Sequence, residues 1–369
     1  MGLKVKQKIT GLALLAAALP VVATIIISLI LNAQISEQAE NDLKTDAELK
    51  LRQIAMDAHN MLSVADHDID MKLESGMKMS EYLANQNGGM NLSPQLVNLT
   101  ITDQYTKQSQ NVAIPQLRMG NIPITLNTSP ERKALMADDV TGILGGLYTV
   151  YQRVNEEGDM VRLSTNVMKD GKRAAGTYLP AIHDGKPHPI VSAVLSGKTY
   201  TGNTFVIDAW YKGMYKPFYD NMGRVIGMYS MAFKQEENQE LRKNIIDIKV
   251  GKTGYVFVLG GKKYKQNYGH YIISQGGKSD GKNVLGAKDA DDRPIIQLMI
   301  DQAMASDTVS YFEYPWKNAG ETEARDKIAG LYYFEPWDWV IGPSAYIEEF
   351  YEARDNIVAG LDNLLMMSL

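Results

Sequence analysis

The sequence begins with an apolar segment, from Ile9 to Leu31, that contains no Asp, Glu, Lys or Arg. As an α-helix this segment would be about 34 Å long, which exceeds the roughly 30 Å of a bilayer's hydrocarbon core. Pro20 falls inside it and is compatible with a kinked membrane helix. The segment therefore predicts one transmembrane helix over residues 9–31.

The residues on either side of this segment predict its orientation. Lys4, Lys6 and Lys8 precede it, whereas Glu37 and Glu40 follow it. Because positive charge is retained on the cytoplasmic side, residues 1–8 are expected in the cytoplasm, and the bulk of the chain outside the bacterial inner (cell) membrane, in the periplasm or beyond. A cleaved signal peptide is the alternative, but its apolar core is usually about 7–15 residues long and a small-residue cleavage site follows it.

Composition excludes several classes of function. The formal net charge of −5 provides no basic surface for nucleic acid. No cysteine is present, so disulfides, thiol chemistry and Cys-type zinc sites are impossible. Neither G-x-S-x-G nor H-E-x-x-H occurs in the sequence. We therefore expect a protein that is not an enzyme and has no cofactor and no metal.

Residues 32–88 indicate one long helix, because they contain no proline and apolar residues recur at spacings of 3, 4, 7 and 8. We expect a stalk that continues from the membrane helix. It could form a homodimer seam, which we expect, or pack on its own domain. Four residues along it could bring a metal site together, although a solvated polar face is the better interpretation: Asp57, His59, Asp66 and His67.

Residues 89–234 alternate strand-like runs with turn residues and are expected to form one module. The predicted strands are 96–101, 111–117, 122–126, 147–154, 160–168 and several within 199–233. Ser129 and Pro130 indicate the start of a helix that ends near Gly145 and Gly146. A second short helix is predicted over 189–195.

The second half repeats this scheme. A polar segment, residues 235–250, is predicted to be a connector helix. Residues 251–346 form the second module, with strands at 255–259, 270–274, 309–314, 327–334 and 339–346 and a helix at about 294–305. Both halves end on a strand with Val-Ile-Gly, at 225–227 and 340–342, which indicates two copies of one unit. Residues 347–369 predict a helix that leads to a truncated or missing second transmembrane segment.

Motifs in both halves carry a family resemblance. They are Thr-Asn-Val at 165–167, Gly-Thr at 176–177, AVLSGKTYTG at 193–202, Tyr-Lys-Pro at 215–217, GRVIG at 223–227, GKTGYVFV at 251–258 and WDWVIG at 337–342. With the anchor and the stalk, the chain resembles the extracytoplasmic sensor region of a bacterial methyl-accepting chemotaxis protein. The resemblance is to the double Cache class, of the Cache_3–Cache_2 fusion type.

The resemblance implies an α+β fold, with an N-terminal transmembrane helix, a long stalk helix and two stacked PAS-like antiparallel-sheet (double Cache) modules. It also implies chemotaxis signal transduction, in which the membrane-distal module, 89–234, binds a small solute and a conformational signal is transmitted. Such receptors carry a second transmembrane helix, a HAMP segment and a cytoplasmic coiled coil, none of which is recognisable in residues 1–369.

The run from 208 to 215 is the richest in candidate ligand-binding side chains. Asp208 could bind an ammonium group, and Trp210 could form a wall of the pocket. Tyr211 and Tyr215 could donate hydrogen bonds. Alternatively, alternate residues of this strand are core and the others exposed.

Two arginines are candidates for binding a carboxylate, because a guanidinium pairs with it bidentately. They are Arg162, within a predicted strand, and Arg173, beyond it. Either could instead be a surface charge. An organic acid, an amino acid and an amine are all compatible with these residues as the ligand.

The second module offers weaker candidates. An equivalent pocket could be lined by Tyr271, Ser274, Tyr311, Tyr332 and Trp337, although core aromatics are the better interpretation. Residues 276–283 nearly match a phosphate-binding loop, but Asn283 replaces the required hydroxyl. Asp289, Asp291 and Asp292 lack the glycine and glutamate of a calcium loop. The alternatives to a chemoreceptor are a sensor for a histidine kinase or cyclase, and a membrane-anchored structural or assembly protein.

Overall fold

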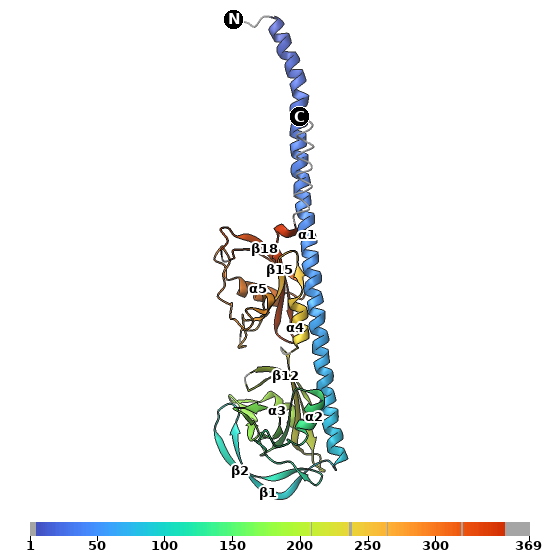
Figure 1. Ribbon diagram of the computed structural model, residues 1–369, viewed down its shortest axis with the longest axis vertical. Coiled ribbons are helices and arrows are strands. Elements are labelled where there is room, and N and C mark those ends of the chain that lie inside the picture. Colours follow the sequence, from blue (N-terminus) through green and yellow to red (C-terminus); the bar gives the residue numbers. More distant parts are fainter. Residues whose placement is uncertain (1–4, 208, 236–237, 264, 319, 351–369) are drawn as a thin grey trace. The chain divides into compact units, whose positions relative to one another are not determined.

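The computed structural model describes residues 5–207, 209–235, 238–263, 265–318 and 320–350 (Figure 1). The chain divides into two compact units. Unit 1 comprises residues 1–62 and 239–369, and unit 2 comprises residues 63–238. Each unit combines helices with a main sheet of its own.

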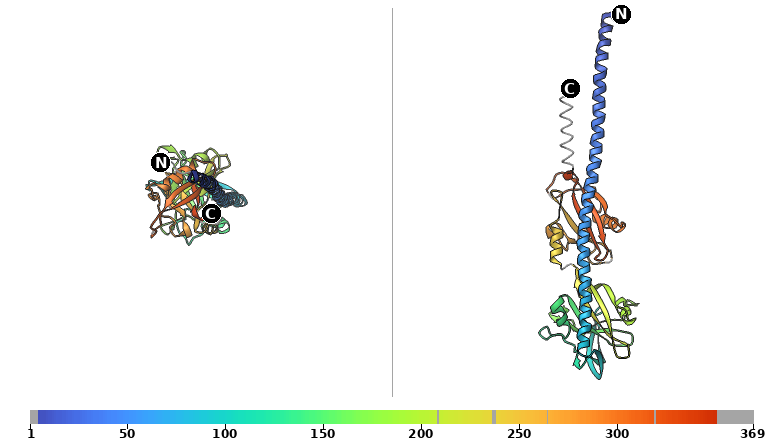
Figure 2. Two further views of the ribbon diagram at one scale, coloured as in Figure 1. Left: turned by 90° about the horizontal axis from the view of Figure 1, so that it is seen from above. Right: turned by 90° about the vertical axis from the view of Figure 1, so that its right-hand side faces the viewer.

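Helix α1 runs from Val5 to Gln86 and contributes residues to both units (Figure 2). The predicted helical region 32–88 lies almost wholly within it, and its role as a stalk stays a prediction. Buried side chains recur every three or four residues, which is the period of a helix with one packed face. They include Leu51, Ala55, Ala58 and Leu62 in unit 1, and Ala65, Ile69, Leu73 and Met77 in unit 2.

The predicted transmembrane segment, residues 9–31, lies in the part of α1 where most side chains are outside the described residues. No helix in the described part of the chain is both long enough and apolar enough to cross a membrane. The predicted C-terminal helix also falls outside the described residues from position 351 onward.

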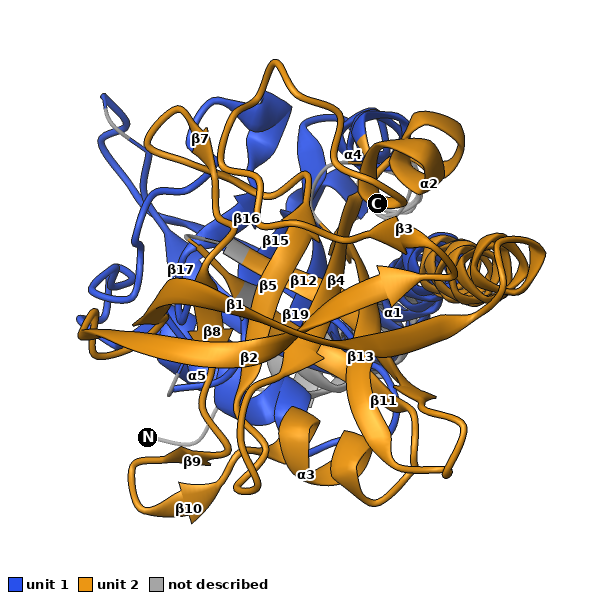
Figure 3. Cartoon of the chain, turned by 90° about the horizontal axis from the view of Figure 1, so that it is seen from below, with its two compact units in different colours: residues 1–62, 239–369 blue, residues 63–238 orange. Residues whose placement is uncertain are grey.

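Unit 2 is built on a nine-stranded sheet in the order β11-β12-β13-β4-β5-β8-β1-β2-β3 (Figure 3). β1 and β8 are parallel, and the other neighbouring strands are antiparallel. Its strands are β1 (Met90–Asp103), β2 (Ser109–Met119), β3 (Ile122–Pro123), β4 (Leu147–Arg153), β5 (Met160–Thr165), β8 (Thr177–Leu179), β11 (Tyr200–Val206), β12 (Ala209–Tyr219) and β13 (Val225–Lys234). Two small hairpins are separate from it: β6 (Met168–Lys169) with β7 (Lys172–Arg173), and β9 (Ile182–His183) with β10 (Lys186–Pro187).

Two short helices complete unit 2, α2 (Ala137–Leu144) and α3 (Pro189–Leu195). The prediction for α3 is confirmed. The helix start predicted at Ser129 is wrong, because α2 begins at Ala137. The Arg173 guanidinium donates to the carbonyls of Ser129, Pro130 and Arg132, so these carbonyls serve a tertiary contact instead of a helix.

The sheet of unit 2 is covered on both faces. On one face, Tyr148 of β4 donates its hydroxyl to Ser80 of α1, over 2.6 Å. On the other face, α3 packs its Val191 and Val194 against a buried cluster that includes Tyr215 and Met228. The second face therefore carries the aromatic groups considered below.

Unit 1 contains a six-stranded sheet in the order β14-β15-β19-β18-β17, with β16 paired to β15. Its strands are β14 (Lys249–Val250), β15 (Gly254–Gly260), β16 (Tyr271–Ile273), β17 (Ser310–Trp316), β18 (Arg325–Phe334) and β19 (Trp339–Tyr346). Its helical elements are α4 (Gln239–Ile246), η2 (Gln275–Gly277) and α5 (Ile295–Met304). Of the described residues of the predicted connector helix, 235–250, those of α4 are helical, and Lys249 and Val250 instead pair with β15.

The repeated Val-Ile-Gly places a glycine opposite a phenylalanine in both units. Gly227 of β13 is paired with Phe218 of β12, and Gly342 of β19 is paired with Phe257 of β15. A Cβ on Gly227 would lie 2.3 Å from the Phe218 ring, and one on Gly342 would lie 2.1 Å from the Phe257 ring. Each ring therefore occupies the space that a side chain on the glycine would need.

This packing predicts that Gly227→Ala destabilises the protein by about 1–3 kcal/mol, the usual effect of overpacking a core. The matched control is Gly142→Ala in α2, where no atom lies within 4 Å of the added Cβ. The control should be neutral or stabilising by up to about 1 kcal/mol, because alanine favours a helix. Thermal unfolding of the purified chain compares the two, and equal melting temperatures would contradict the packing argument.

Candidate functional site

The site is centred on Arg162, which lies on β5 and is 4% exposed. Its Nη1 donates to Thr177 Oγ1 over 2.6 Å, and its Nη2 donates to Gln104 Oε1 over 3.4 Å. The Nε atom is buried and has no hydrogen-bond partner. The guanidinium carbon lies 5.4 Å from the centre of the Tyr151 ring on β4. One edge of this guanidinium is therefore left without an acceptor.

Arg162 also lacks a counter-ion within the described part of the chain. Among the described residues, no carboxylate oxygen lies within 4.0 Å of its guanidinium nitrogens. A buried charge without a partner is costly unless another group compensates it. Arg162 is therefore suited to receive a negative charge from outside the protein.

Tyrosine rings surround the guanidinium. The ring centres of Tyr151 and Tyr215 are 6.5 Å apart, and those of Tyr200 and Tyr215 are 6.1 Å apart. The Tyr215 hydroxyl lies 3.1 Å from Thr204 Oγ1. Burial raises the pKa of Tyr215, so its phenol is neutral at physiological pH. Together with Val191 of α3, these rings form an apolar wall with hydroxyl groups in it.

A second group of rings joins the turn after β1 to the segment before α3. The Tyr105 hydroxyl lies 2.9 Å from His188 Nε2, and the Tyr105 ring stacks on His183 with 3.8 Å between centres. His188 Nδ1 is buried and has no hydrogen-bond partner. Burial, and secondarily His183, lowers the pKa of His188 to about 4. His188 is therefore neutral at physiological pH.

The structure brings together two of the six predicted site residues. Arg162 and Tyr215 face the same tyrosine cluster, whereas Tyr211 packs in another cluster with Val167 and Val206. Strand alternation turns Trp210 to the opposite face from Tyr211. Asp208 lies outside the described residues.

Arg173 is not part of this site. Its Nη1 and Nη2 each lie 2.9 Å from a different oxygen of Asp138, and its Nη1 also donates to the Thr165 carbonyl. Its charge is therefore already neutralised by a bidentate pair. Its contacts hold the loop before α2.

Sequence reasoning missed five residues of the site: Gln104, Tyr105, Tyr151, Thr177 and His188. Every residue from Tyr148 to Gln152 is buried, so an alternating burial pattern could not separate Tyr151 from its neighbours. Thr177 lies in the Gly-Thr pair that carries part of the resemblance. No local signal marks Tyr105 or His188, which are 83 positions apart.

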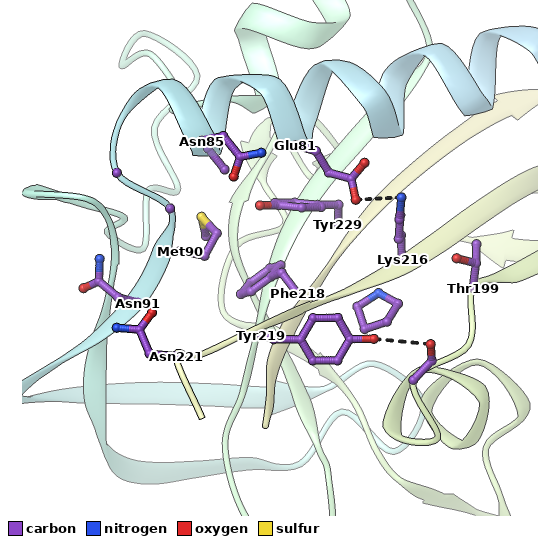
Figure 4. Close-up of a pocket in the computed structure, with 15 residues that line it drawn as sticks. Glu81, Asn85, Met90, Asn91, Thr199, Lys216, Phe218, Tyr219, Asn221 and Tyr229 are labelled. Atoms are coloured by element: carbon purple, nitrogen blue, oxygen red, sulfur yellow. Dashed lines mark hydrogen bonds and ion pairs between the residues drawn. The ribbon is translucent and has the colours of Figure 1, made fainter. Parts of the chain in front are cut away.

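Apart from the Arg162 site, unit 2 has a hollow of about 640 Å³, where α1 ends beside β12 and β13 (Figure 4). Glu81 and Lys216 point toward one another across it, with 2.6 Å between carboxylate and ammonium. The Tyr219 hydroxyl donates to the Gly197 carbonyl over 3.3 Å. Because this ammonium already has a carboxylate partner, the hollow is a weaker candidate for an anion than Arg162.

Several of the weaker sequence candidates have structural roles in unit 1. Tyr332 packs edge-on against His59 of α1, with 4.7 Å between ring centres. Trp337 is 2% exposed and packs against Trp339. Ser274 donates to Asp280, and Asp289 pairs with Arg293 over 2.6 Å. Within the described residues, no group of three or more His, Asp or Glu side chains could hold a metal ion.

The buried imidazole predicts a pH dependence of stability. The pKa of His188 is about 4 in the folded protein and 6.5 ordinarily. Between these values the unfolded chain binds a proton that the folded protein does not. The contribution of the neutral His188 imidazole to the free energy of unfolding is therefore complete above about pH 6.5. It decreases, by at most about 3 kcal/mol, as the pH falls to about 4.

His188→Gln should flatten this part of the profile of unfolding free energy against pH. His67→Gln, which changes an exposed histidine on α1, should leave the profile unchanged. Denaturant unfolding of the purified chain at several pH values measures both. A His188→Gln profile that matches the unsubstituted protein between pH 6.5 and 4 would contradict a buried neutral imidazole.

Comparisons with known proteins agree with this architecture. The family model for the Cache 3/Cache 2 fusion domain matches residues 36–360. The sensor histidine kinase MctS of Rhizobium johnstonii is 23% identical over 136 residues, which cover 36% of this chain and 28% of the kinase. The chain thus matches less than a third of that relative's length.

Two solved structures align with this chain. The sensory domain of the Campylobacter jejuni chemoreceptor Tlp3, solved with isoleucine bound, is 10% identical; the alignment covers 85% of this chain and 98% of that one, with a TM-score of 0.45. A methyl-accepting chemotaxis protein from Vibrio parahaemolyticus is 23% identical, with 30% and 71% covered and a TM-score of 0.25. Because the family model spans most of the chain, the protein belongs to the Cache 3/Cache 2 fusion domain family.

Proposed function

We propose that this protein is an extracytoplasmic sensor that binds a small organic acid at Arg162 in unit 2. The observation that carries the proposal is the buried guanidinium, which has no carboxylate partner among the described residues and has an unpartnered Nε. A carboxylate would supply both the missing charge and the missing hydrogen-bond acceptor. An ammonium ligand is disfavoured, because the central charge is already positive.

The other groups limit the ligand's size and shape. Tyr151 and Tyr215 offer aromatic faces and hydroxyls, and Val191 and Val194 offer an apolar surface. Such a lining suits a short acid with an apolar portion, held by a few polar groups that fix its orientation. The neutral Tyr105–His188 pair adds no second positive charge at physiological pH. A monocarboxylate is therefore favoured over a di- or tricarboxylate.

Strand β12 offers a route from this site to α1. Tyr215 faces the site, whereas Lys212 and Lys216 face α1. Lys212 Nζ lies 2.9 Å from Asp66 and 2.7 Å from Asp70. A ligand that shifts Tyr215 would therefore move the strand that these ion pairs tie to the helix. The ligand can shift the equilibrium between two arrangements of α1 only by the difference between its affinities for the two.

The family and the sequence together support a proposal for the cellular role. We propose that residues 9–31 anchor the chain in the bacterial inner membrane, with most of it periplasmic, and that the output is a chemotaxis response. Val64 and Met71 of α1 are 71% and 52% exposed and lie one heptad apart, which supports a homodimer through this helix. The partial match to MctS favours, as a second candidate, input to a histidine kinase.

The first test is Arg162→Met. In the unsubstituted protein, a bound acid at about 100 times its dissociation constant should stabilise the fold by about 2.7 kcal/mol. Charge-assisted hydrogen bonds of about 1.5–3 kcal/mol predict that Arg162→Met weakens binding roughly 10- to 100-fold. The ligand-free variant should melt at the same or a higher temperature, because an unpaired buried charge is removed. Thermal shift and calorimetric titration of the full chain measure both effects.

The matched control is Arg224→Met, which removes a largely exposed guanidinium paired with Asp220 in the same unit. It should keep full affinity. If Arg162→Met lowers the ligand-free melting temperature and leaves affinity unchanged, Arg162 is a structural residue and the proposed site is wrong. Assays of methylation and autophosphorylation in cells then distinguish the outputs, because a chemoreceptor changes its methylation and a kinase its autophosphorylation.

A further inference from the structure

The hollow beside the end of α1 lies on the α1 face of the unit 2 sheet, whereas Tyr215 and the Arg162 site lie on the other face. Its volume, about 640 Å³, is within the roughly 300–1,000 Å³ that is usual for ligand pockets. Residues of α1, β1, β12 and β13 and of the turns beside them line it (Figure 4). An acid bound at Arg162 would leave this hollow open.

The hollow carries no net charge. Glu81 and Lys216 are the charged side chains of its lining, and they pair with each other over 2.6 Å. An ammonium has three donors and a carboxylate can accept about four hydrogen bonds, so this contact leaves both groups able to form more. A charged ligand would compete with one member of the pair for the other, whereas a neutral ligand can bond to both.

Four uncharged side chains of the lining have hydrogen-bonding groups to spare. The carboxamides of Asn85 and Asn221 and the hydroxyls of Thr199 and Tyr229 have no hydrogen-bond partner among the described residues. Burial raises the pKa of Tyr229, so its hydroxyl keeps its proton at physiological pH. Every one of these groups can both donate and accept. They therefore match the hydroxyl groups of a ligand, which also do both.

A shift of strand register brings two aromatic rings of β12 to the hollow. Adjacent residues of a strand normally point to opposite faces, yet Phe218 and Tyr219 both line it. Phe218 is paired with Gly227 and Tyr219 with Val225, so a β-bulge lies between them and redirects a side chain. Tyr219 is 43% exposed, and its hydroxyl donates to the Gly197 carbonyl over 3.3 Å. Its ring is therefore held in place with an apolar face open to a ligand.

The end of α1 gives the hollow a fixed edge. Gly88 and Gly89 have φ angles of 93° and 80°, and the Gly89 N–H donates to the Ala84 carbonyl over 2.8 Å. The Gly120 N–H donates to the Gly89 carbonyl over 2.7 Å, and Asn91 Nδ2 donates to the Gly120 carbonyl over 3.1 Å. Because these bonds already order the edge, a ligand would lose little affinity to ordering it.

We propose that this hollow binds a neutral polyhydroxylated ligand, a monosaccharide or a cyclic polyol, independently of the acid site. The apolar face of the ligand ring would stack on Tyr219. Neighbouring hydroxyls of the ring would bond to Asn85 and Asn221, because a carboxamide can donate to one hydroxyl and accept from the next. Other hydroxyls would bond to Glu81 on α1 and Lys216 on β12, so the ligand would bridge the helix and the sheet of unit 2.

Calorimetric titration of the full chain with D-glucose, D-galactose, D-ribose and myo-inositol tests this site. We expect at least one of them to bind with a Kd of about 1 mM or tighter. Cyclohexanol has a ring with a single hydroxyl and should bind roughly tenfold more weakly or not at all. Tyr219→Ala removes the stacking face and should also weaken binding roughly tenfold or more, whereas Tyr219→Phe keeps the ring and should change affinity by less than about threefold.

The matched control is Tyr82→Ala, which removes a tyrosine that is 62% exposed on α1 and lies outside the hollow. It should keep full affinity for the sugar. Arg162→Met should keep it too, so failure of the acid site and failure of the sugar site are distinguishable. Asn221→Ala should weaken binding severalfold, and because Asn221 is exposed in a turn, this variant tests the hollow even if Tyr219→Ala does not fold.

Two results would overturn the proposal. One is that none of the four ligands binds, and the other is that neither Tyr219→Ala nor Asn221→Ala weakens binding relative to Tyr82→Ala. Glycine or acetate serves as the charged comparison, in the Arg162→Met protein. If either binds more tightly than all four neutral ligands and loses affinity in Tyr219→Ala, the proposed ligand class is wrong.

Discussion

In each unit, α1 packs on one face of the sheet, and this packing determines where the other elements lie. Leu51 and Leu62 are fully buried in unit 1, as is Leu73 in unit 2. Covering one face by a long helix leaves the other face to short elements, α3 in unit 2 and α5 in unit 1. A ligand could therefore bind at the second face without displacing α1 from the sheet.

Charge is distributed differently on the two faces. Toward α1, Lys212 and Lys216 each have carboxylate partners within 3 Å. Toward the short helix α3, Arg162 is buried without any such partner in the described part of the chain. It lies beside Tyr215, which burial keeps neutral. An unpaired buried cation is not favoured by protein stability alone, and this cost is the physical reason for proposing that Arg162 binds an anion.

Much of the fold could be predicted from the sequence, because its signals are local. The bounds of α3 and β19 agree with those expected from Pro189 and from the turn before Trp339. The site could be predicted only in part, because it depends on contacts between distant residues. Nothing near Arg173 in the sequence indicates its bidentate partner Asp138, 35 positions earlier. Nor does the sequence indicate that Arg162 has no carboxylate partner among the residues that the structure describes. The two arginines therefore could not be ranked by their pattern alone.

A crystal structure of the chain with a bound monocarboxylate that stabilises it would show whether Arg162 holds the acid. We expect density for the carboxylate against the Arg162 guanidinium, with one oxygen accepting from Nε and the apolar end against Tyr151 and Tyr215. Density for the acid only in the hollow beside Glu81 and Lys216, with the Arg162 Nε still unpartnered, would contradict it.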